Sequence, residues 1–515
     1  MKTNNNMLIG VSTIATLLLT GSISAQAEPS VEPPTNQYLA DSAWPMSHRN
    51  PYNQASSPYP GISPVDVYNG NIEVDVEATI PVSITVPFSS SYNTWTGEER
   101  RAAWAATTLE VIKMEMNGDD IQRVQKINVP PSKNPLSGAY SIVDSENDFF
   151  VPRDLSIHKY DDNYEKVVFS KFKEAALYTV PAELTLSPDD YIVGMNITYD
   201  GHIVFATAAG LIGVLDRNFE SASYTVLGDS GIVSNSIAVD EEGGIYIVSS
   251  KQMHRVQWTG TELSRDPAVG AWTADYDTGP ETPLPGRLGT GSGSTPTLMG
   301  TGEQDDKFVV LTDGQELMNL VLMWRDEIPA DWEPIAPGKD RRIAAEIPVT
   351  YGNPDATSSM SEQSVLVRGY SAVVVNNEYG DAVPAQLSVL LSNLPGVAPY
   401  GIEKFTWNPE MNTGASEWAN PTISCPNGIP TMSEATSLIY CIGTRQGAWT
   451  LEGTSWDNGQ TVFAFPLGGT NPLIAGAPTW NSHYAATQVA ENGDIVTGTY
   501  GGVVRIQKKS VGNNK

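Results

Sequence analysis

Cysteine is almost absent from this chain, which carries only Cys425 and Cys441 among its 515 residues. No Cys-x-x-Cys-His motif occurs, so covalently attached haem is excluded, and this pair alone is a poor metal site. Histidine is also scarce, with five residues. Neither Gly-x-Ser-x-Gly nor His-Glu-x-x-His is present, which excludes the hydrolase elbow and the zinc-protease helix that these motifs mark.

Positive charge is low as well. Lysine and arginine together number 30 against 59 acidic residues, a formal net charge of −29. Nucleic acids and anionic membranes bind clustered Lys and Arg, so neither is expected as a partner. The acidic residues are expected to form a solvated surface that keeps the protein soluble.

The hydrophobic run from Met7 to Leu19 follows Lys2 and is too short to span a bilayer. Ala25-Gln-Ala27 then provides a signal-peptidase pattern. We therefore expect a signal peptide at residues 1–27, a disordered Pro- and Glu-containing leader at 28–40, and one domain at 41–515. The protein would be exported, either periplasmic or secreted, without membrane insertion. In such an oxidising compartment, Cys425 and Cys441 are expected to form a disulfide.

The composition favours short strands. With 40% hydrophobic residues, 45 glycines and 36 prolines, the chain suits many strands joined by tight turns. The clearest unit runs from Asn235 to Gly260, where apolar residues alternate on both sides of the turn at residues 240–244, and a third strand is expected from Met253 to Trp258. Such a unit buries one face only, so its repetition predicts a closed ring, a β-propeller.

The inner strand of this unit recurs through the chain. Seven members begin at Tyr140, Met195, Asn235, Thr295, Gln363, Asn427 and Thr487, spaced 40 to 68 residues apart. Compact propeller repeats take roughly 40 to 45 residues, so we expect loops inserted between blades. The predicted fold is an all-β propeller of seven blades, with eight as the alternative. The region before residue 130 would hold an eighth blade or the strand that closes the ring against Gly502 to Gln507.

Three short motifs resemble known propeller families. Trp44-Pro-Met-Ser-His-Arg-Asn50 and Trp456-Asp-Asn-Gly-Gln-Thr-Val462 resemble motifs of the pyrroloquinoline-quinone-type propellers. Pro426-Asn-Gly-Ile429, with Leu438-Ile-Tyr440, is similar to the gluconolactonase type. The adjacent Cys-Cys pair and the repeated tryptophan motifs of quinoprotein dehydrogenases are absent. The first resemblance therefore implies the fold and not quinone-dependent catalysis, while the second implies Asn427 and Glu362 as ligands of a divalent cation such as calcium.

The positions of the seven inner strands also predict a binding site, because all blades of a propeller have the same orientation. Inner strands start at one face, so the seven starting residues are expected to surround the mouth of the central channel. Their amide and hydroxyl groups suit a sugar, a lactone or a hydrated cation, although such groups also hold channel waters. Ligand-binding candidates are Tyr140, Asn235, Thr295, Gln363, Asn427, Thr487 and Tyr484.

Chargeable residues in the loops before inner strands supply catalytic candidates. Arg287, Glu362 and His483 are expected above the channel, where they would transfer protons or stabilise an oxyanion. The other four histidines, His48, His158, His202 and His254, are expected to be non-catalytic. The glycine-rich residues 289–293 precede a strand and are expected to let a loop pass close to the channel mouth.

Two functional classes remain open. The first is an enzyme acting on a small or carbohydrate-derived substrate, either a lactonase-like hydrolase or a polysaccharide lyase. The second is a noncatalytic propeller that binds a ligand or an envelope protein. Fold alone does not separate these classes.

Overall fold

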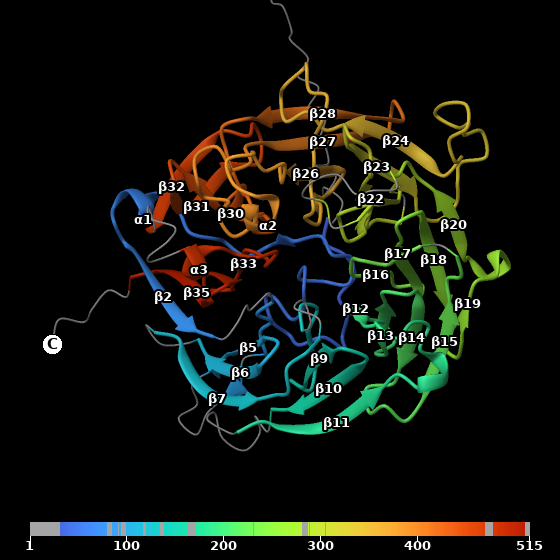
Figure 1. Ribbon diagram of the computed structural model, residues 1–515, viewed down its shortest axis with the longest axis horizontal. Helices are drawn as coiled ribbons and strands as arrows, with labels where there is room; N and C mark the ends of the chain where they lie inside the picture. The colour runs from blue at the N-terminus through green and yellow to red at the C-terminus, as the bar shows by residue number, and fades with distance from the viewer. Residues whose placement is uncertain are drawn as a thin grey trace, which may run out of the picture.

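The computed structural model describes residues 31–79, 85–90, 92–93, 99–116, 120–133, 138–162, 171–229, 231–280, 287, 289–303, 305–468 and 477–509. Within these ranges the chain forms a ring of antiparallel sheets around a central axis (Figure 1). This confirms the β-propeller predicted from the repeating unit. The predicted signal peptide, residues 1–27, lies outside the described residues.

The described residues form eight blades, so the prediction of seven is wrong. Blades are numbered here in chain order from the N-terminus. Their strands are β5 Ala102–Ala106, β6 Glu110–Glu115 and β7 Gln122–Asn128 in blade 1; β8 Ile142–Val143, β9 Phe149–Arg153, β10 Ser156–Asp161 and β11 Lys173–Thr179 in blade 2; β12 Ile192–Ile197, β13 Ile203–Thr207, β14 Leu211–Leu215 and β15 Ala222–Val226 in blade 3; and β16 Ala238–Val239, β17 Gly244–Val248, β18 Gln252–Trp258, β19 Leu263–Ser264 and β20 Trp272–Asp275 in blade 4.

The second half of the ring has the same arrangement. Its strands are β21 Thr297–Met299, β22 Phe308–Thr312, β23 Asn319–Trp324 and β24 Ile343–Pro348 in blade 5; β25 Leu366–Arg368, β26 Ser371–Val375, β27 Ile402–Asn408 and β28 Thr413–Asn420 in blade 6; β29 Thr431–Ser433, β30 Leu438–Arg445, β31 Ala448–Ser455 and β32 Thr461–Gly468 in blade 7; and β33 Gln488–Val489, β34 Ile495–Thr499, β35 Gly502–Lys508 and β2 Ile72–Ala78 in blade 8. Smaller elements are β1 Ser56–Ser57, β3 Tyr92–Asn93, β4 Glu99–Arg100, the helices α1 Pro64–Tyr68, α2 Ala385–Ser388 and α3 Ala477–Trp480, and the 3₁₀ turns Ala182–Leu184 and Pro267–Val269.

The repeat found in the sequence did not include blade 1, because the strands of this blade do not show the apolar alternation. Strand β5 is nearly all alanine, and β6 carries the buried polar side chains of Lys113 and Glu115. Lys113 forms an ion pair with the buried Asp162 of blade 2, which compensates its charge. The innermost position is reduced to one bridge between Phe88 and Ala103. Because of these charged residues, the hydrophobic pattern of the sequence does not identify β6 as a buried strand.

The ring closes by pairing the two ends of the chain. Strand β2 is the outermost strand of blade 8 and runs antiparallel to β35, with Ile72 opposite Lys508 and Ala78 opposite Gly502. Both alternatives for the region before residue 130 are therefore realised, since it supplies a blade and the closing strand. This pairing covers the outer edge of β35 and joins the N-terminal region to the last blade.

Local chemistry fixes the turns between strands. In blade 4, Asp240 Oδ1 accepts hydrogen bonds from the amides of Glu242 and Gly244 at 3.0 and 2.7 Å. Gly243 has φ 82°, a left-handed conformation that glycine adopts without steric cost. The strands on each side, β16 and β17, form where the period-two pattern predicted them, but every residue in them is buried, whereas the pattern predicted burial of one face only.

Residues 36–57, termed here the N-terminal segment, run along the inside of the ring (Figure 1). Phe88 in blade 1 donates its amide proton to the carbonyl of Trp44 at 2.8 Å. Inner-strand amides of blades 2, 4, 5, 6 and 7 donate to segment carbonyls: Val143 to Pro45, Val239 to Pro51, Leu298 to Tyr52, Val367 to Gln54 and Met432 to Ala55, at 2.8 to 3.1 Å. The segment thus follows the blades in order and pairs the inner edges that a propeller otherwise leaves exposed.

Part of the expected leader is packed on the ring. Leu39 and Ala40 are buried, and Leu39 bridges to Asp144 in blade 2. The Asn36 side chain donates to the carbonyl of Thr198 at 3.0 Å. No helix in the described part of the chain is long and apolar enough to cross a membrane.

The predicted disulfide is confirmed. Cys425 and Cys441 are bonded, with their Cα atoms 5.9 Å apart. The bond ties the loop before β29 to the neighbouring strand β30 of the same blade.

Candidate functional site

The loops that lead into the inner strands converge on one cavity, termed here the central pocket. All eight blades and the N-terminal segment contribute to its wall, which is lined by Ser47, His48, Thr85, Ala139, Tyr140, Pro152, Tyr191, Ile192, Val193, Ser234, Asn235, Gly293, Thr295, Glu362, Ser364, Ile429, Tyr484 and Ala486. The cavity volume is about 70 Å³, measured as the space open to the centres of water molecules. One water needs roughly 10 to 15 Å³ on that measure, so the pocket holds several waters or one small ligand.

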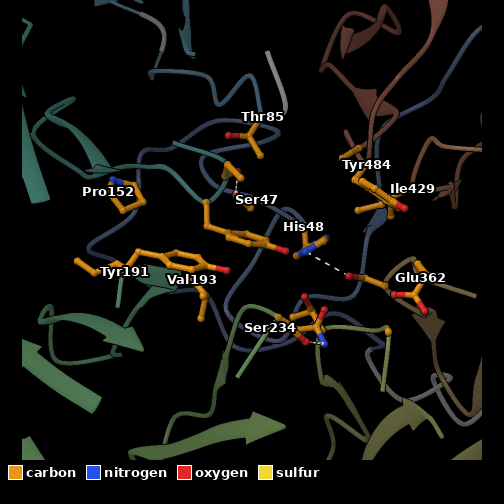
Figure 2. A pocket seen from close by; sticks show the side chains of 18 residues that line it. Ser47, His48, Thr85, Pro152, Tyr191, Val193, Ser234, Glu362, Ile429 and Tyr484 are labelled. Atoms are coloured by element: carbon orange, nitrogen blue, oxygen red, sulfur yellow. Dashed lines mark hydrogen bonds between the residues drawn. The ribbon is translucent and has the colours of Figure 1, made fainter. Parts of the chain in front are cut away.

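The N-terminal segment places His48 in the middle of the pocket. Figure 2 shows His48 between Tyr191 and Val193 on one side and Glu362 and Tyr484 on the other. The backbone there is left-handed at two successive residues, with φ 58° at His48 and 78° at Arg49. Left-handed backbone at non-glycine residues costs free energy and gathers at functional sites.

The His48 side chain is almost completely buried and incompletely paired. Its Nε2 lies 3.3 Å from the Ser364 hydroxyl, drawn as a dashed line in Figure 2. Its Nδ1 is buried without a hydrogen-bond partner among the described residues. Leaving such a nitrogen unpaired costs about 1 to 3 kcal/mol. Burial lowers the pKa of His48 from 6.5 to about 4, so the ring is neutral at pH 7.

The opposite wall is acidic and aromatic. Glu362 is 7% exposed, and its carboxylate lies against Gly293, where a Cβ would approach it to 2.7 Å. Glycine is needed at 293 for this close approach, as the sequence predicted for residues 289–293. Burial, together with the negative charge of Glu362, raises the pKa of Tyr484. Tyr484 is also left-handed, with φ 56°.

Three members of the predicted ring lie in the pocket wall: Tyr140, Asn235 and Thr295. Asn235 Nδ2 donates to the Ser292 carbonyl at 2.9 Å, which fixes the amide at the rim. Burial raises the pKa of Tyr140, opposed by hydrogen bonds with Thr295 and the backbone of Ser236. These groups keep hydroxyl and amide functions next to the cavity.

The other ring members do not line the pocket. Met195 lies within β12, which starts three residues earlier than predicted, so that Tyr191, Ile192 and Val193 reach the cavity instead. Gln363 turns the other way and donates to the Cys425 carbonyl at 3.2 Å. Thr487 is fully buried and is not part of the lining.

The Asn427 side chain forms hydrogen bonds with neighbouring loops and does not face the pocket. Its Oδ1 accepts from Tyr379 at 2.6 Å, and its Nδ2 donates to Ser392, to Asn481 and to the Val389 carbonyl. Ser392 and Val389 belong to the insertion that carries α2, so Asn427 anchors this insertion. The side-chain amide is fully occupied by these contacts.

The three predicted catalytic residues do not meet. Arg287 is buried and donates to the backbone carbonyls of Asp313, Gln315 and Ser359 at 2.8 to 3.4 Å, which joins blades 5 and 6. His483 packs on Tyr484 and its Nδ1 lies 2.8 Å from the Tyr500 hydroxyl. Burial lowers the pKa of His483 to about 4. Of the three, only Glu362 lies in the lining of the central pocket.

The donor set does not fit the divalent cation implied by the gluconolactonase resemblance. Asn427 Oδ1 is already engaged by Tyr379. Among the described residues, no group of three or more His, Cys, Asp or Glu side chains is placed to hold a metal ion. Hard divalent cations need several oxygen ligands together, which Glu362 alone does not supply.

The remaining histidines lie away from the pocket. His202 is in the β12–β13 turn at the opposite face, 3.0 Å from Asp200. His158, on β10, contacts Glu174 at 2.8 Å. His254, on β18, is buried between Ser249 and Thr273.

Most of the other pocket residues were missed by the sequence reasoning, and two of these, His48 and Ser364, lie within hydrogen-bond distance of each other. His48 belongs to the Trp44–Asn50 motif, which was recognised as a family resemblance but not placed in space. Ser364 follows Gln363 directly, and in an extended chain successive side chains point to opposite sides. A signal therefore existed for Ser364 but not for His48, whose position depends on backbone contacts.

Comparison with known proteins locates the chain among propellers. No protein-family model matches the sequence. An uncharacterised protein of Archaeoglobus fulgidus is 42% identical over 489 residues, which cover 92% of this chain and 89% of that protein. A europium-containing methanol dehydrogenase matches the structure with a TM-score of 0.51 at 10% identity, covering 90% of this chain and 98% of that one. A streptogramin B lyase matches with a TM-score of 0.39 at 11% identity, covering 85% and 98%. The methanol dehydrogenase likeness shows the propeller fold and carries no activity across.

Proposed function

We propose a function from the central pocket itself, because the chain belongs to the family of the uncharacterised Archaeoglobus fulgidus protein and that membership carries no activity with it. The protein binds a small, uncharged, hydroxyl-rich ligand, such as a monosaccharide or a sugar-derived lactone, at the mouth of the propeller channel. The observation that carries this proposal is the make-up of the pocket wall.

Three features of the wall support a neutral polar ligand. Tyr140, Tyr191 and Tyr484 offer aromatic surfaces on which a sugar ring can pack. Serine and threonine hydroxyls and the Asn235 amide offer donors and acceptors. The described lining contains neither lysine nor arginine, so a phosphate or carboxylate ligand would lack a cationic partner.

The pocket size favours a single small molecule over the middle of a polymer chain, because a cavity of about 70 Å³ holds only several waters. The disulfide fits an oxidising compartment, and we extend this to an exported protein that is periplasmic or secreted. Binding without turnover would make the protein a noncatalytic ligand-binding propeller, which is the alternative within the same site.

Calorimetric titration of the purified protein with neutral monosaccharides and lactones tests the proposal. Tyr191 packs beside the pocket and is partly exposed, so Tyr191→Ala removes an aromatic surface. We expect its affinity to fall at least about tenfold, which corresponds to roughly 1.4 kcal/mol. The matched control is His202→Ala on the opposite face, which should leave the affinity within about twofold. Equal losses in the two variants, or binding of anionic ligands only, would contradict the proposal.

A further inference from the structure

Two serine–histidine pairs of nearly equal geometry are buried in this molecule. Ser364 Oγ lies 3.3 Å from His48 Nε2 in the central pocket, and Ser249 Oγ lies 3.4 Å from His254 Nε2 in blade 4. Burial lowers the pKa of both histidines to about 4. Their surroundings nevertheless differ, and the difference separates a structural pair from one available for chemistry.

The blade 4 pair is satisfied on every side. His254 Nδ1 lies 3.1 Å from the Thr273 hydroxyl, and Ser249 Oγ donates to the Gln252 carbonyl at 3.0 Å. His254 is on the regular strand β18, and neither residue lines the central pocket. This pair is explained by the packing of its own blade.

The pocket pair is not explained in that way. Both Ser364 and His48 line the cavity, so a ligand there would lie against both residues. Within the described chain, His48 Nδ1 is buried without a partner, and the backbone at His48 is left-handed at φ 58°. The fold thus retains an unpaired ring nitrogen and a strained backbone at the cavity, which a packing role does not require.

We propose that Ser364 and His48 form a nucleophile and general-base pair that hydrolyses a carboxylic ester or lactone bound in the central pocket. This inference rests on the proposed function, because it assigns chemistry to the same ligand site. A serine hydroxyl within hydrogen-bond reach of a neutral imidazole is the arrangement that activates serine for acyl transfer.

The reaction balances with water as the only co-reactant. Ser364 Oγ bonds to the carbonyl carbon while its proton moves to His48 Nε2, and the bond from that carbon to the leaving oxygen then breaks. The proton on Nε2 passes to the leaving oxygen. A water then attacks the acyl-serine, gives a proton to Nε2, and releases the acid as Ser364 Oγ is reprotonated.

The test uses the full-length protein and a biotinylated fluorophosphonate, which reacts with activated serines. Peptide mass spectrometry should locate the adduct on Ser364. Ser364→Ala should abolish labelling, and His48→Asn should slow it at least about tenfold, since asparagine tolerates left-handed backbone and cannot act as the base. Ser249→Ala, which removes the serine of the blade 4 pair, should label at the rate of the parent.

Hydrolysis of p-nitrophenyl acetate and of a six-membered sugar lactone should follow the same order, with a loss of at least about 100-fold in Ser364→Ala. No adduct on the parent, an adduct on another serine, or equal labelling of Ser364→Ala would overturn the nucleophile assignment. Calorimetry of Ser364→Ala with the lactone separates the two proposals. Binding without labelling of the parent would leave ligand binding intact and remove the chemistry, whereas absence of binding to both parent and variant would remove the proposed function itself.

Discussion

At the scale of single residues, the role of a buried histidine depends on the partners of its two ring nitrogens. His254 and His48 are both desolvated, which disfavours the imidazolium form and lowers each pKa to about 4. His254 has partners on both nitrogens, so its burial costs no hydrogen bond. His48 has one partner among the described residues, and its second nitrogen is buried without one.

The lowered pKa of His254 predicts a pH dependence of stability. In the unfolded chain histidine titrates near 6.5, so as the pH falls from about 6.5 to 4 the unfolded state takes up a proton that the folded state refuses. The free energy of unfolding therefore decreases as the pH falls through that window, and His254 does not change it above pH 6.5. The slope is about 1.4 kcal/mol per pH unit, or roughly 2 kcal/mol between pH 7 and pH 5.

Urea denaturation of the parent and of His254→Asn at pH 7 and pH 5 measures this contribution. The stability gap between parent and variant should shrink by about 2 kcal/mol at the lower pH, because only the parent carries this titrating group. Ser249→Ala is the control, since it removes the contact and keeps the histidine. An unchanged gap at the two pH values would show that His254 is not held neutral by burial.

The pocket residues that could be predicted are those fixed by the strand register. Tyr140 and Thr295 lie two residues before the inner strands β8 and β21, Asn235 lies three residues before β16, and all three line the pocket. Asn427 lies four residues before the inner strand β29 and is turned to the α2 insertion, whose contacts leave no periodic signal in the sequence. His48 depends on the path of the N-terminal segment, which the spacing of blades does not encode.

At the scale of elements, the N-terminal segment connects the blades from the inside of the ring. Its carbonyls accept hydrogen bonds from inner strands of several blades, and Asn53 adds side-chain bonds. Asn53 Nδ2 donates to the carbonyls of Ile237 and Pro296, both at 3.0 Å, and so joins blades 4 and 5. The segment also forms the pocket floor through Ser47 and His48, which couples ring stability to the site.

We predict that Asn53→Ala destabilises the fold by about 2 to 5 kcal/mol. The substitution removes the side-chain donor to the buried Pro296 carbonyl, while the Ile237 carbonyl keeps its 2.8 Å hydrogen bond from Asn196 Nδ2. Alanine also fits left-handed backbone less well than asparagine, φ at this residue being 62°. Asn412→Ala is the matched control, because Asn412 is also left-handed at φ 51° but lies in an exposed turn. The control should cost roughly 1 kcal/mol. Similar losses of unfolding free energy in the two variants would show that the side-chain hydrogen bonds of Asn53 contribute little.

Seven of the eight blades could be read from the sequence because apolar alternation and turns such as Asp240–Gly244 mark them. Blade 1 could not, since Lys113 and Glu115 occupy buried positions that the pattern assigns to solvent. The burial of Lys113 is possible only because Asp162, 49 residues away, pairs with it. A long-range ion pair of this kind cannot be recognised in one strand alone.

At the scale of the whole molecule, the ring is held by its last blade. Blade 8 takes β33, β34 and β35 from the C-terminal region and β2 from the N-terminal region. Strand β35 lies between β34 and β2 and pairs with both along its length. Its side chains Val503, Val504 and Ile506 are fully buried, so the strand is also part of the core.

Removal of every residue from Gly502 onward should therefore abolish cooperative unfolding. The truncation leaves β34 and β2 as two unpaired edges and opens the contact between the first and last blades, so the blades lose the closure that couples them. Differential scanning calorimetry should show a broad transition, or several, in place of one sharp peak. A second truncation that ends after Lys509 keeps all of β35 and should melt like the parent. If the shorter chain also melts like the parent in one transition, pairing of β35 with β2 does not hold the ring closed.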